Sequence, residues 1–290
     1  MHSLERPRPD VVPLSPLQYE EIVRRELATD LGTAGDITTA ALVPRGLRAS
    51  AHMVARRDGR VCGLSASLYA FQALGTVDCR LLQQDGDDVT PGVVLAKLEG
   101  PAHVLLSAER TALNVLGHLS GVATATRNLV RDVVKAGPAR VVCTRKTTPG
   151  LRSLEKYAVR VGGAWNHRFG LFDAVLVKDN HRVMVGGVRA AVVQARAARG
   201  HLVRVEVEVD TLEQLEEALA AGADVVLLDN MSPSTLRQAV AIVRGRVPTE
   251  ASGGITPETI ADVAATGVDF ISVGWITHSA PALDVGLDFV

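Results

Sequence analysis

Apolar positions follow a regular pattern in the second half of the chain. From about Arg140, short β-branched runs alternate with Ala-rich segments of helical spacing, separated by polar or Gly-rich turns. Six strands are predicted, over 141–144, 174–177, 203–209, 225–228, 249–252 and 270–273. Repeated strand–helix units imply parallel strands joined by right-handed crossovers. This half therefore predicts an α/β domain, either a barrel or an open doubly wound sheet.

Several helices between these strands have recognisable caps. Thr211 followed by Gln214 predicts a capping box, and Gly222 is placed to end that helix. Ser232-Pro233 and Thr256-Pro257 each combine a capping residue with a proline suited to the first helical position.

The segment from Val203 to Val209 favours the barrel. Its valines occupy one face of the predicted strand, whereas Arg204, Glu206 and Glu208 occupy the other. In an open parallel sheet helices cover both faces, so both should be apolar. A charged inner face is easier to satisfy inside a barrel that serves a polar site.

The first half of the chain predicts a smaller α+β domain. Ser15-Pro16 opens a helix that should run through Leu27, and residues 104–119 have helical spacing of apolar positions. Between them, residues 85–98 alternate turns with short β-prone pieces. We place the division between the two domains at residues 117 and 118.

Composition adds mainly exclusions. The net charge is −1 and 22% of residues are charged, so nothing suggests binding to nucleic acid or to an anionic membrane. The first ten residues include Glu5, Arg6, Arg8 and Asp10 where a signal peptide needs an apolar run. The three cysteines, Cys62, Cys79 and Cys143, have no metal-ligand spacing and form no disulfide framework. We therefore expect a cytoplasmic protein.

The carboxyl ends of the predicted strands are unusually polar, and in barrel enzymes these ends build the active site. One set is cationic: Arg145, Lys146, His167, Arg168 and Lys178. Such a set suits a substrate with several carboxylates or phosphates.

The acidic residues at these ends are Glu208 and Asp229, on neighbouring strands. They suit Mg²⁺, which prefers oxygen ligands and usually accompanies substrate phosphate. The alternative for both is an internal salt bridge to Lys178 or Arg204. Ser252-Gly253-Gly254 precedes a predicted capped helix and, with the turn at Gly274, suggests a phosphate site.

These residues stand in motifs that closely resemble the quinolinate phosphoribosyltransferase family. The motifs are Asp30-Leu31-Gly32, Gly35-Asp36-Ile37-Thr38-Thr39, Glu109-Arg110-Thr111-Ala112-Leu113-Asn114, His118-Leu119-Ser120-Gly121, Thr144 to Arg152, Lys156-Tyr157-Ala158-Val159, Gly162-Gly163, Asn166-His167-Arg168, Lys178-Asp179-Asn180-His181, Val205 to Val209, Leu227-Leu228-Asp229-Asn230 and Ser252-Gly253-Gly254. Together they cover nearly the whole chain.

The resemblance implies an α/β fold: an incomplete (β/α) barrel over 118–280 and a smaller N-terminal α/β sandwich over 1–117, rejoined by the C-terminal tail 281–290. It implies at least a homodimer, in which Arg110 reaches the partner's site. Arg145, His167, Arg168 and Lys178 would hold the carboxylates of quinolinate. Lys146 would face phosphoribosyl pyrophosphate, and Glu208 and Asp229 would bind Mg²⁺ and the ribose hydroxyls. Ser252, Gly253 and Gly274 would hold the 5′-phosphate, with His278 nearby.

The reaction that the resemblance implies makes nicotinate mononucleotide, pyrophosphate and CO₂ for NAD biosynthesis. One departure is Trp275, which is larger than the small residue expected there; we expect it to pack outside the phosphate pocket.

Two other functions remain open from the residues. One is a barrel aldolase or decarboxylase in which Lys178 forms a Schiff base. The other is a non-catalytic binding protein or a molybdenum-transport-associated homologue, against which the complete cationic set argues.

Overall fold

The computed structural model describes residues 11–290 and divides into two compact units. The first contains the chain up to Arg127 together with residues 147–163 and 276–290, and the second contains residues 128–146 and 164–275. The residues that argue against a signal peptide, Glu5 to Asp10, lie outside the described part. Within the described part, no helix is both long and apolar enough to cross a membrane.

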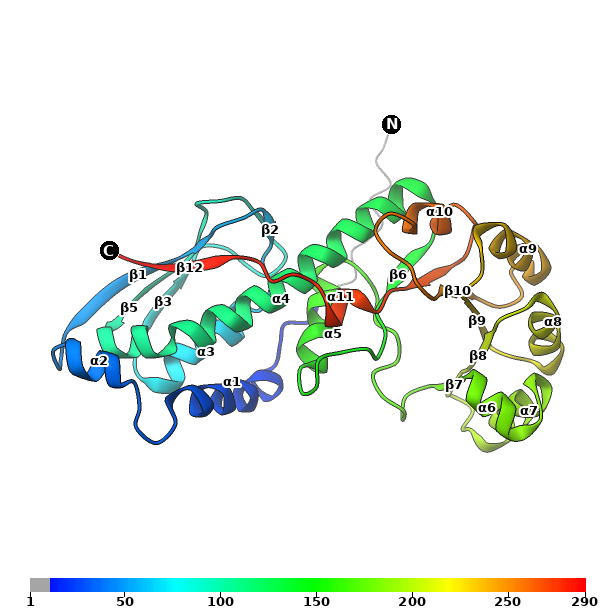
Figure 1. Ribbon diagram of the computed structural model, residues 1–290, viewed down its shortest axis with the longest axis horizontal. Helices are drawn as coiled ribbons and strands as arrows, with labels where there is room; N and C mark the ends of the chain where they lie inside the picture. The colour runs from blue at the N-terminus through cyan, green and yellow to red at the C-terminus, as the bar shows by residue number, and fades with distance from the viewer. Residues whose placement is uncertain (1–10) are drawn as a thin grey trace. The chain divides into compact units, whose positions relative to one another are not determined.

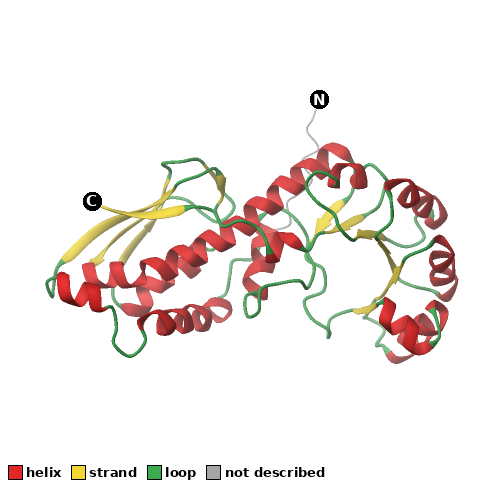
Figure 2. Ribbon diagram, viewed as in Figure 1, coloured by secondary structure: helices red, strands yellow, loops and turns green. Residues whose placement is uncertain are grey.

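The first unit is built on a four-stranded antiparallel sheet in the order β12-β1-β5-β3, with helices along one side (Figures 1 and 2). Its strands are β1 (Arg48–Ala55), β3 (Asp78–Leu81), β5 (Val94–Pro101) and β12 (Val285–Phe289), and a separate pair is formed by β2 (Gly59–Arg60) and β4 (Asp88–Val89). Its helices are α1 (Pro16–Leu31), α2 (Ile37–Leu42), α3 (Leu64–Leu74), α5 (Arg152–Val161) and most of α4 (Ala102–Ala136).

The two faces of this sheet differ in polarity. Met53 of β1 and Leu98 of β5 are buried, which places them in the core. His52 pairs with Lys97 on the opposite face, where Lys97 is exposed. The period of two therefore gives the sheet one apolar and one polar side.

The second unit contains a parallel sheet of six strands in the order β6-β11-β10-β9-β8-β7, with helices along its outer side (Figure 1). The strands are β6 (Arg140–Val142), β7 (Val175–Val177), β8 (Val205–Val209), β9 (Val225–Asp229), β10 (Thr249–Ser252) and β11 (Phe270–Ser272). The helices are α6 (Asp179–Val185), α7 (Val188–Ala198), α8 (Leu212–Ala221), α9 (Pro233–Val243), α10 (Ile260–Ala264) and α11 (Trp275–His278), which ends in the first unit. Among the described residues β6 and β7 end the sheet and do not pair with each other, so the barrel is incomplete. The predicted fold class and all six predicted strands are confirmed.

Strand β8 has the charged inner face that favours a barrel-like sheet. Val205, Val207 and Val209 are fully buried, and Glu206 and Glu208 on the other face are buried as well. Arg204 precedes β8 and is exposed, so it does not belong to the buried part of this face. The inner face of β8 is therefore acidic.

The helix caps agree with the sequence in two cases. Thr211 accepts a hydrogen bond from the N–H of Gln214 at 3.3 Å, while the side chain of Gln214 accepts from the N–H of Asp210. Gly222 ends α8 in the left-handed conformation, with φ of 86°. Ser232 accepts from the N–H of Thr235 at 3.2 Å and begins α9.

The cap predicted at Thr256-Pro257 is wrong. Helix α10 begins at Ile260 and is five residues long. The carbonyl of Thr256 accepts from the N–H groups of both Thr259 and Ile260, so these residues form a turn before the helix. The glycines at 253 and 254 therefore do not lead directly into a helix N-terminus.

Two glycines of α4 allow the C-terminal tail to lie against this helix. The N–H of Leu283 donates to the carbonyl of Gly117 at 2.9 Å. A Cβ atom on Gly121 would lie 2.2 Å from the carbonyl oxygen of Pro281, which no side-chain rotation can relieve. The tail then continues into β12, which pairs with β1.

We predict that Gly121→Ala destabilises the protein. In an exposed helix this substitution stabilises by about 1 kcal/mol, but here the added methyl group collides with the backbone, and overpacking costs roughly 1–3 kcal/mol. Urea unfolding of the variant should show a lower midpoint. Gly200→Ala is the control, because a Cβ there meets open space; an equal or higher midpoint for Gly121→Ala would contradict the prediction.

Candidate active site

The carboxyl ends of β7, β8 and β9 bring a lysine and two acids together. Lys178 follows β7 as the N-cap of α6, and its Nζ lies 2.9 Å from Oε2 of Glu208 in β8. The N–H of Lys178 donates to Nδ1 of His181, which fixes the main chain at the start of α6. The Lys178 side chain is half exposed, whereas that of Glu208 is buried. The internal ion pair weighed from the sequence therefore exists, and it stands at an open strand end.

Asp229, the last residue of β9, lies near this pair. Burial raises the pKa of Asp229, and the negative charges of Glu208 and Asp210 raise it further, against the lowering effect of Lys178. The acids predicted on neighbouring strands thus interact electrostatically. Two carboxylates in this arrangement are suited to holding a divalent cation.

The segment after β10 is fixed against the end of β9. The N–H of Asn230 donates to the carbonyl of Ser252 at 2.9 Å, and the side-chain amide of Asn230 donates to Asp229 at 2.7 Å. Gly253 has φ of 98°, and a Cβ there would lie 2.1 Å from Oδ1 of Asn230. Only glycine fits this close approach.

The glycine-rich turns of the sequence have no long helix behind them. Ser252 and Gly274 are half-buried at the ends of β10 and β11. Because α10 has five residues and starts at Ile260, a helix dipole does not support a phosphate site here. Trp275 follows Gly274, and its buried indole nitrogen has no hydrogen-bond partner within residues 11–290.

The loop between β6 and β7 supplies a second group of cations. Burial lowers the pKa of Arg168, and the charge of Arg145 lowers it further, so the two guanidinium groups lie within electrostatic reach of each other. The guanidinium of Arg168 donates to the carbonyl of Ala174 at 3.1 Å. Lys146, next to Arg145, is exposed. Like charges held this close are suited to an anionic ligand.

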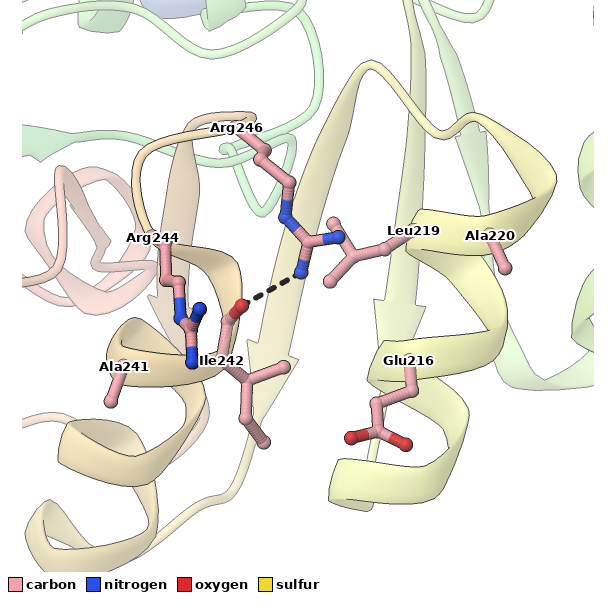
Figure 3. A pocket seen from close by; sticks show the side chains of 7 residues that line it. All are labelled: Glu216, Leu219, Ala220, Ala241, Ile242, Arg244 and Arg246. Atoms are coloured by element: carbon pink, nitrogen blue, oxygen red, sulfur yellow. Dashed lines mark hydrogen bonds between the residues drawn. The ribbon is translucent and has the colours of Figure 1, made fainter.

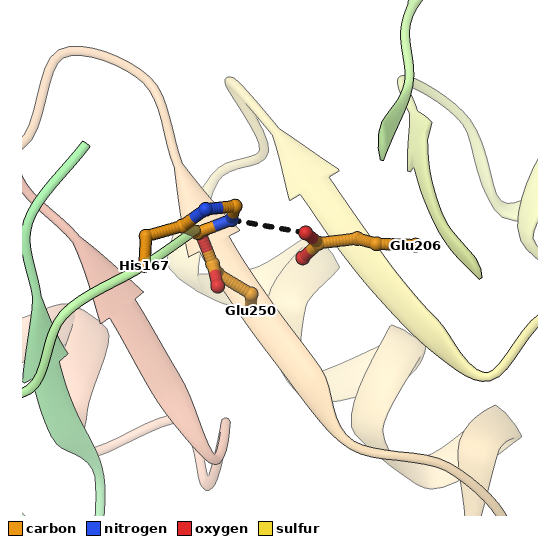
Figure 4. Close-up of side chains that lie close together, drawn as sticks. All are labelled: His167, Glu206 and Glu250. Atoms are coloured by element: carbon orange, nitrogen blue, oxygen red, sulfur yellow. Dashed lines mark hydrogen bonds and ion pairs between the residues drawn. The ribbon is translucent and has the colours of Figure 1, made fainter. Parts of the chain in front are cut away.

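On the inner face of the sheet, the predicted site residue His167 meets two buried acids that the sequence did not assign to the site. Nε2 of His167 lies 3.0 Å from Oε2 of Glu206 in β8 and 3.7 Å from Oε1 of Glu250 in β10 (Figure 4). Burial, and to a lesser extent the charge of Glu206, raise the pKa of Glu250 to about 8. Two sequence signals point to these acids. Glu206 alternates with Glu208 along β8, and Glu250 lies within the short buried strand β10.

Two predicted site residues belong to the other unit. Arg110 is exposed on α4, and His278 is exposed at the end of α11, where its Nδ1 lies 2.6 Å from Oγ of Ser279. The second unit thus brings together the predicted residues at the ends of β6 to β10, and the roles of Arg110 and His278 stay predictions.

A groove on the helical side of the second unit is separate from these residues. It has a volume of about 730 Å³ and lies between α8 and α9 (Figure 3). Its lining includes Leu219, Ile242, Arg244 and Arg246, and both guanidinium groups stand at the end of α9. None of the predicted site residues lines it.

Comparisons with known proteins agree with this description. The quinolinate phosphoribosyl transferase N-terminal domain matches residues 36–120, and the C-terminal domain of the same enzyme matches residues 122–288. A probable nicotinate-nucleotide pyrophosphorylase (carboxylating) of Bacillus subtilis is 44% identical over 273 residues, which cover 94% of this chain and 93% of the relative. The nicotinate-nucleotide pyrophosphorylase (carboxylating) of Mycobacterium leprae is 45% identical, with 92% and 96% covered.

Solved structures show the same fold. The nicotinate-nucleotide pyrophosphorylase of Francisella tularensis has a TM-score of 0.92 at 38% identity, covering 97% of this chain and 99% of that one. NadC from Streptococcus pyogenes has a TM-score of 0.91 at 39% identity, covering 96% and 99%. The two matched domains and the similar relatives define the protein as a phosphoribosyltransferase. Within that class, the chain belongs to the quinolinate phosphoribosyltransferase family, whose enzymes act in NAD biosynthesis.

We predict that Glu250→Gln changes how stability depends on pH. The folded-state pKa of about 8 lies above the unfolded value of about 4.5, so the native state binds more protons between these values. Ionising Glu250 therefore costs stability as pH rises from about 4.5 to 8, and glutamine removes this cost. The melting temperature of the variant should exceed that of the wild type at pH 8.5, with the difference shrinking toward pH 5.

The control for this measurement is Glu216→Gln, an exposed position on α8. Its difference from the wild type should stay constant with pH. A Glu250→Gln difference that is constant, or that grows as pH falls, would contradict the assignment of a raised pKa to Glu250.

Proposed function

We propose that the protein transfers the phosphoribosyl group of phosphoribosyl pyrophosphate to quinolinate with decarboxylation, in an Mg²⁺-dependent reaction that yields nicotinate mononucleotide, pyrophosphate and CO₂. The observation that carries this proposal is the separation of charge at the strand ends. Arg145 and Arg168 form a cationic group, and Glu208 and Asp229 form an acidic one, with Lys178 paired to Glu208. A dicarboxylate and a metal-bound diphosphate need these two environments side by side.

Quinolinate binds through its two carboxylates in this proposal. Arg145, Arg168 and Lys178 hold them, with His167 beside Arg168 in the same loop. A guanidinium can hold a carboxylate through two parallel hydrogen bonds, which fixes the plane of the ligand as well as its position. The ring nitrogen can then be aimed at the anomeric carbon of the second substrate.

Glu208 and Asp229 would hold Mg²⁺. They fit this ion because both offer carboxylate oxygen from neighbouring strands, and the charge of Glu208 already raises the pKa of Asp229. When bound, Mg²⁺ would neutralise part of the negative charge of the pyrophosphate. The same acids would also contact the ribose hydroxyls.

The chain's own residues account for the remaining steps. Lys146 neutralises the pyrophosphate as its bond to the anomeric carbon breaks and that carbon becomes oxocarbenium-like. The pyridine nitrogen donates its electron pair to this carbon and becomes positive. That charge stabilises the ring carbanion left when the adjacent carboxylate departs as CO₂, and the carbanion then takes up a proton. The second carboxylate stays bound and keeps the ring oriented.

The same proposal includes a site for the 5′-phosphate, a homo-oligomer and a cellular location. Ser252, Gly253 and Gly274 hold the 5′-phosphate. Arg110 reaches the site of a second copy in a homodimer or larger homo-oligomer, and the enzyme works in the cytoplasm.

Lys178 argues against the aldolase alternative. A Schiff base needs a neutral amine, whereas Nζ of Lys178 lies 2.9 Å from a carboxylate oxygen of Glu208 and is its ion-pair partner.

The direct test mixes the protein with Mg²⁺, phosphoribosyl pyrophosphate and quinolinate. Chromatography should show nicotinate mononucleotide, with CO₂ and pyrophosphate in equal amounts, and chelation of the metal should stop the reaction. Nicotinate is the parallel substrate. Turnover of nicotinate but not quinolinate, or binding of quinolinate without any product, would overturn the proposal.

We predict that Arg145→Ala chiefly weakens quinolinate binding, whereas Lys146→Ala chiefly slows turnover. Loss of a charge-assisted hydrogen bond costs about 1.5–3 kcal/mol, so Arg145→Ala should raise the KM for quinolinate roughly 10- to 100-fold. Lys146→Ala should chiefly lower kcat by a similar factor, because its charge acts on the leaving group. Steady-state kinetics distinguish the two, and equal losses that follow reduced thermal stability would count against both roles.

A further inference from the structure

His167 is engaged by the protein at both ring nitrogens. Nε2 lies 3.0 Å from Oε2 of Glu206, with Oε1 of Glu250 at 3.7 Å on the same side (Figure 4). Nδ1 lies 2.8 Å from the backbone nitrogen of Arg168, the next residue. The side chains of all three cluster members are nearly nine-tenths buried or more.

These contacts fix the tautomer of the ring. A backbone N–H can only donate, so Nδ1 of His167 must be the acceptor and carries no proton. The ring proton therefore sits on Nε2 and points toward the carboxylate of Glu206. This assignment leaves the imidazole neutral, with its single donor already used inside the barrel.

The same tautomer decides against a metal centre in this cluster. A metal bound at Nε2 would need the lone pair there, and the ring proton would have to move to Nδ1. The Nδ1–H group of His167 and the N–H group of Arg168 would then face each other across 2.8 Å. Both are donors, and neither would have an acceptor.

The loop that follows His167 is held at several points. The N–H groups of Phe169 and Gly170 both donate to the carboxylate of Asp173, at 2.6 and 2.9 Å. The guanidinium of Arg168 donates to the carbonyl of Ala174 at 3.1 Å. The N–H of Arg168 donates to Nδ1 of His167, and this hydrogen bond fixes the main chain at Arg168 itself. The buried acids thus connect, through the imidazole, to the backbone that carries the guanidinium.

We propose that His167 is a positioning residue, which its hydrogen bond to Glu206 holds in place so that it sets the main chain, and hence the guanidinium, of Arg168. It acts on quinolinate through Arg168 and supplies neither a charge nor a hydrogen bond to the substrate carboxylates. Glu206 becomes a positioning residue in turn, and Glu250 lies beside this pair with its Oε1 3.7 Å from the ring. Burial and the charge of Glu206 raise the pKa of Glu250 to about 8, so we expect Glu250 to be protonated at pH 7 and the buried pair to hold one negative charge. This inference rests on the proposed function for its kinetic part only.

Two substitutions of His167 separate the roles of its nitrogens. The side-chain oxygen of asparagine is placed like Nδ1 and can accept from the next N–H, as Asp179 does from Asn180 at 2.7 Å. The side-chain nitrogen of glutamine is placed like Nε2 and can donate to Glu206. If His167 acts through the main chain of Arg168, His167→Asn should retain more quinolinate affinity than His167→Gln. The reverse order would overturn the proposal, because a direct ligand would use Nε2.

The expected kinetic pattern is a selective change in the KM for quinolinate. His167→Gln and Glu206→Gln should raise it about tenfold and leave the KM for phosphoribosyl pyrophosphate within about twofold. Glu250→Gln should raise it no more than about threefold, because an amide resembles a protonated carboxyl group. Glu216→Gln on α8 is the matched control. A tenfold loss in Glu250→Gln equal to that in Glu206→Gln would contradict a proton on Glu250.

A double-mutant cycle tests the route through the guanidinium. In an Arg168→Ala background, His167→Gln should cause less than a twofold further change in the KM for quinolinate. A full additional tenfold loss would show that His167 contacts the substrate independently.

The tautomer is measured without any substrate, so it stands apart from the proposed function. Protein with ¹⁵N-labelled histidine rings should show, at pH 7, a neutral Nε2–H signature that disappears in His167→Asn. An imidazolium or an Nδ1–H tautomer at this position would overturn the positioning role, even if quinolinate turns over. Failure of turnover with the expected tautomer would overturn only the proposed function.

Discussion

The structure of the second unit depends on placing acids on the inner face of a parallel sheet. Glu206 and Glu208 in β8 and Glu250 in β10 are all buried, and a buried charge is tolerated only when a partner or a proton compensates it. Lys178 compensates Glu208 at the carboxyl end of the strands, where the lysine side chain is half exposed. His167, which belongs to the loop between β6 and β7, compensates Glu206 deeper in the sheet. The need to satisfy these acids thus brings loops from different strands to one place.

The strands were predictable because each leaves a local signature. A parallel strand needs a short β-branched run, and all six runs between 141 and 273 became strands. The helix ends were less predictable. Thr256-Pro257 has the chemistry of a cap, but the chain uses the Thr256 carbonyl to close a turn, and α10 begins only at Ile260. A cap is a local preference, and the packing of the following segment determines whether a helix continues from it. The length of α4, which runs from Ala102 to Ala136, was also missed, because its apolar spacing was followed only to Leu119.

The site was predictable where chemistry coincides with a strand end. Lys178, Glu208 and Asp229 stand at the ends of three neighbouring strands, and the topology of a parallel sheet brings such positions together. Glu206 and Glu250 were overlooked as functional residues because they lie within strands and not at their ends. Their meeting with His167 depends on how the loop of residues 164–174 folds back, which no local pattern encodes. The roles predicted for Arg110 and His278 come from the family resemblance alone, because composition and spacing carry no signal for them.

The pairing of β12 with β1 has a consequence for how the protein is made. Strand β1 ends at Ala55, but the edge that β12 covers is left without its partner until residues 285–289 have been synthesised. An uncovered strand edge can pair with other chains. During translation, the N-terminal unit must therefore remain incomplete while more than two hundred intervening residues emerge from the ribosome. Premature termination close to the end would remove a structural strand, so even a short C-terminal truncation should send the chain to aggregation or proteolysis although every strand-end residue of the second unit is present.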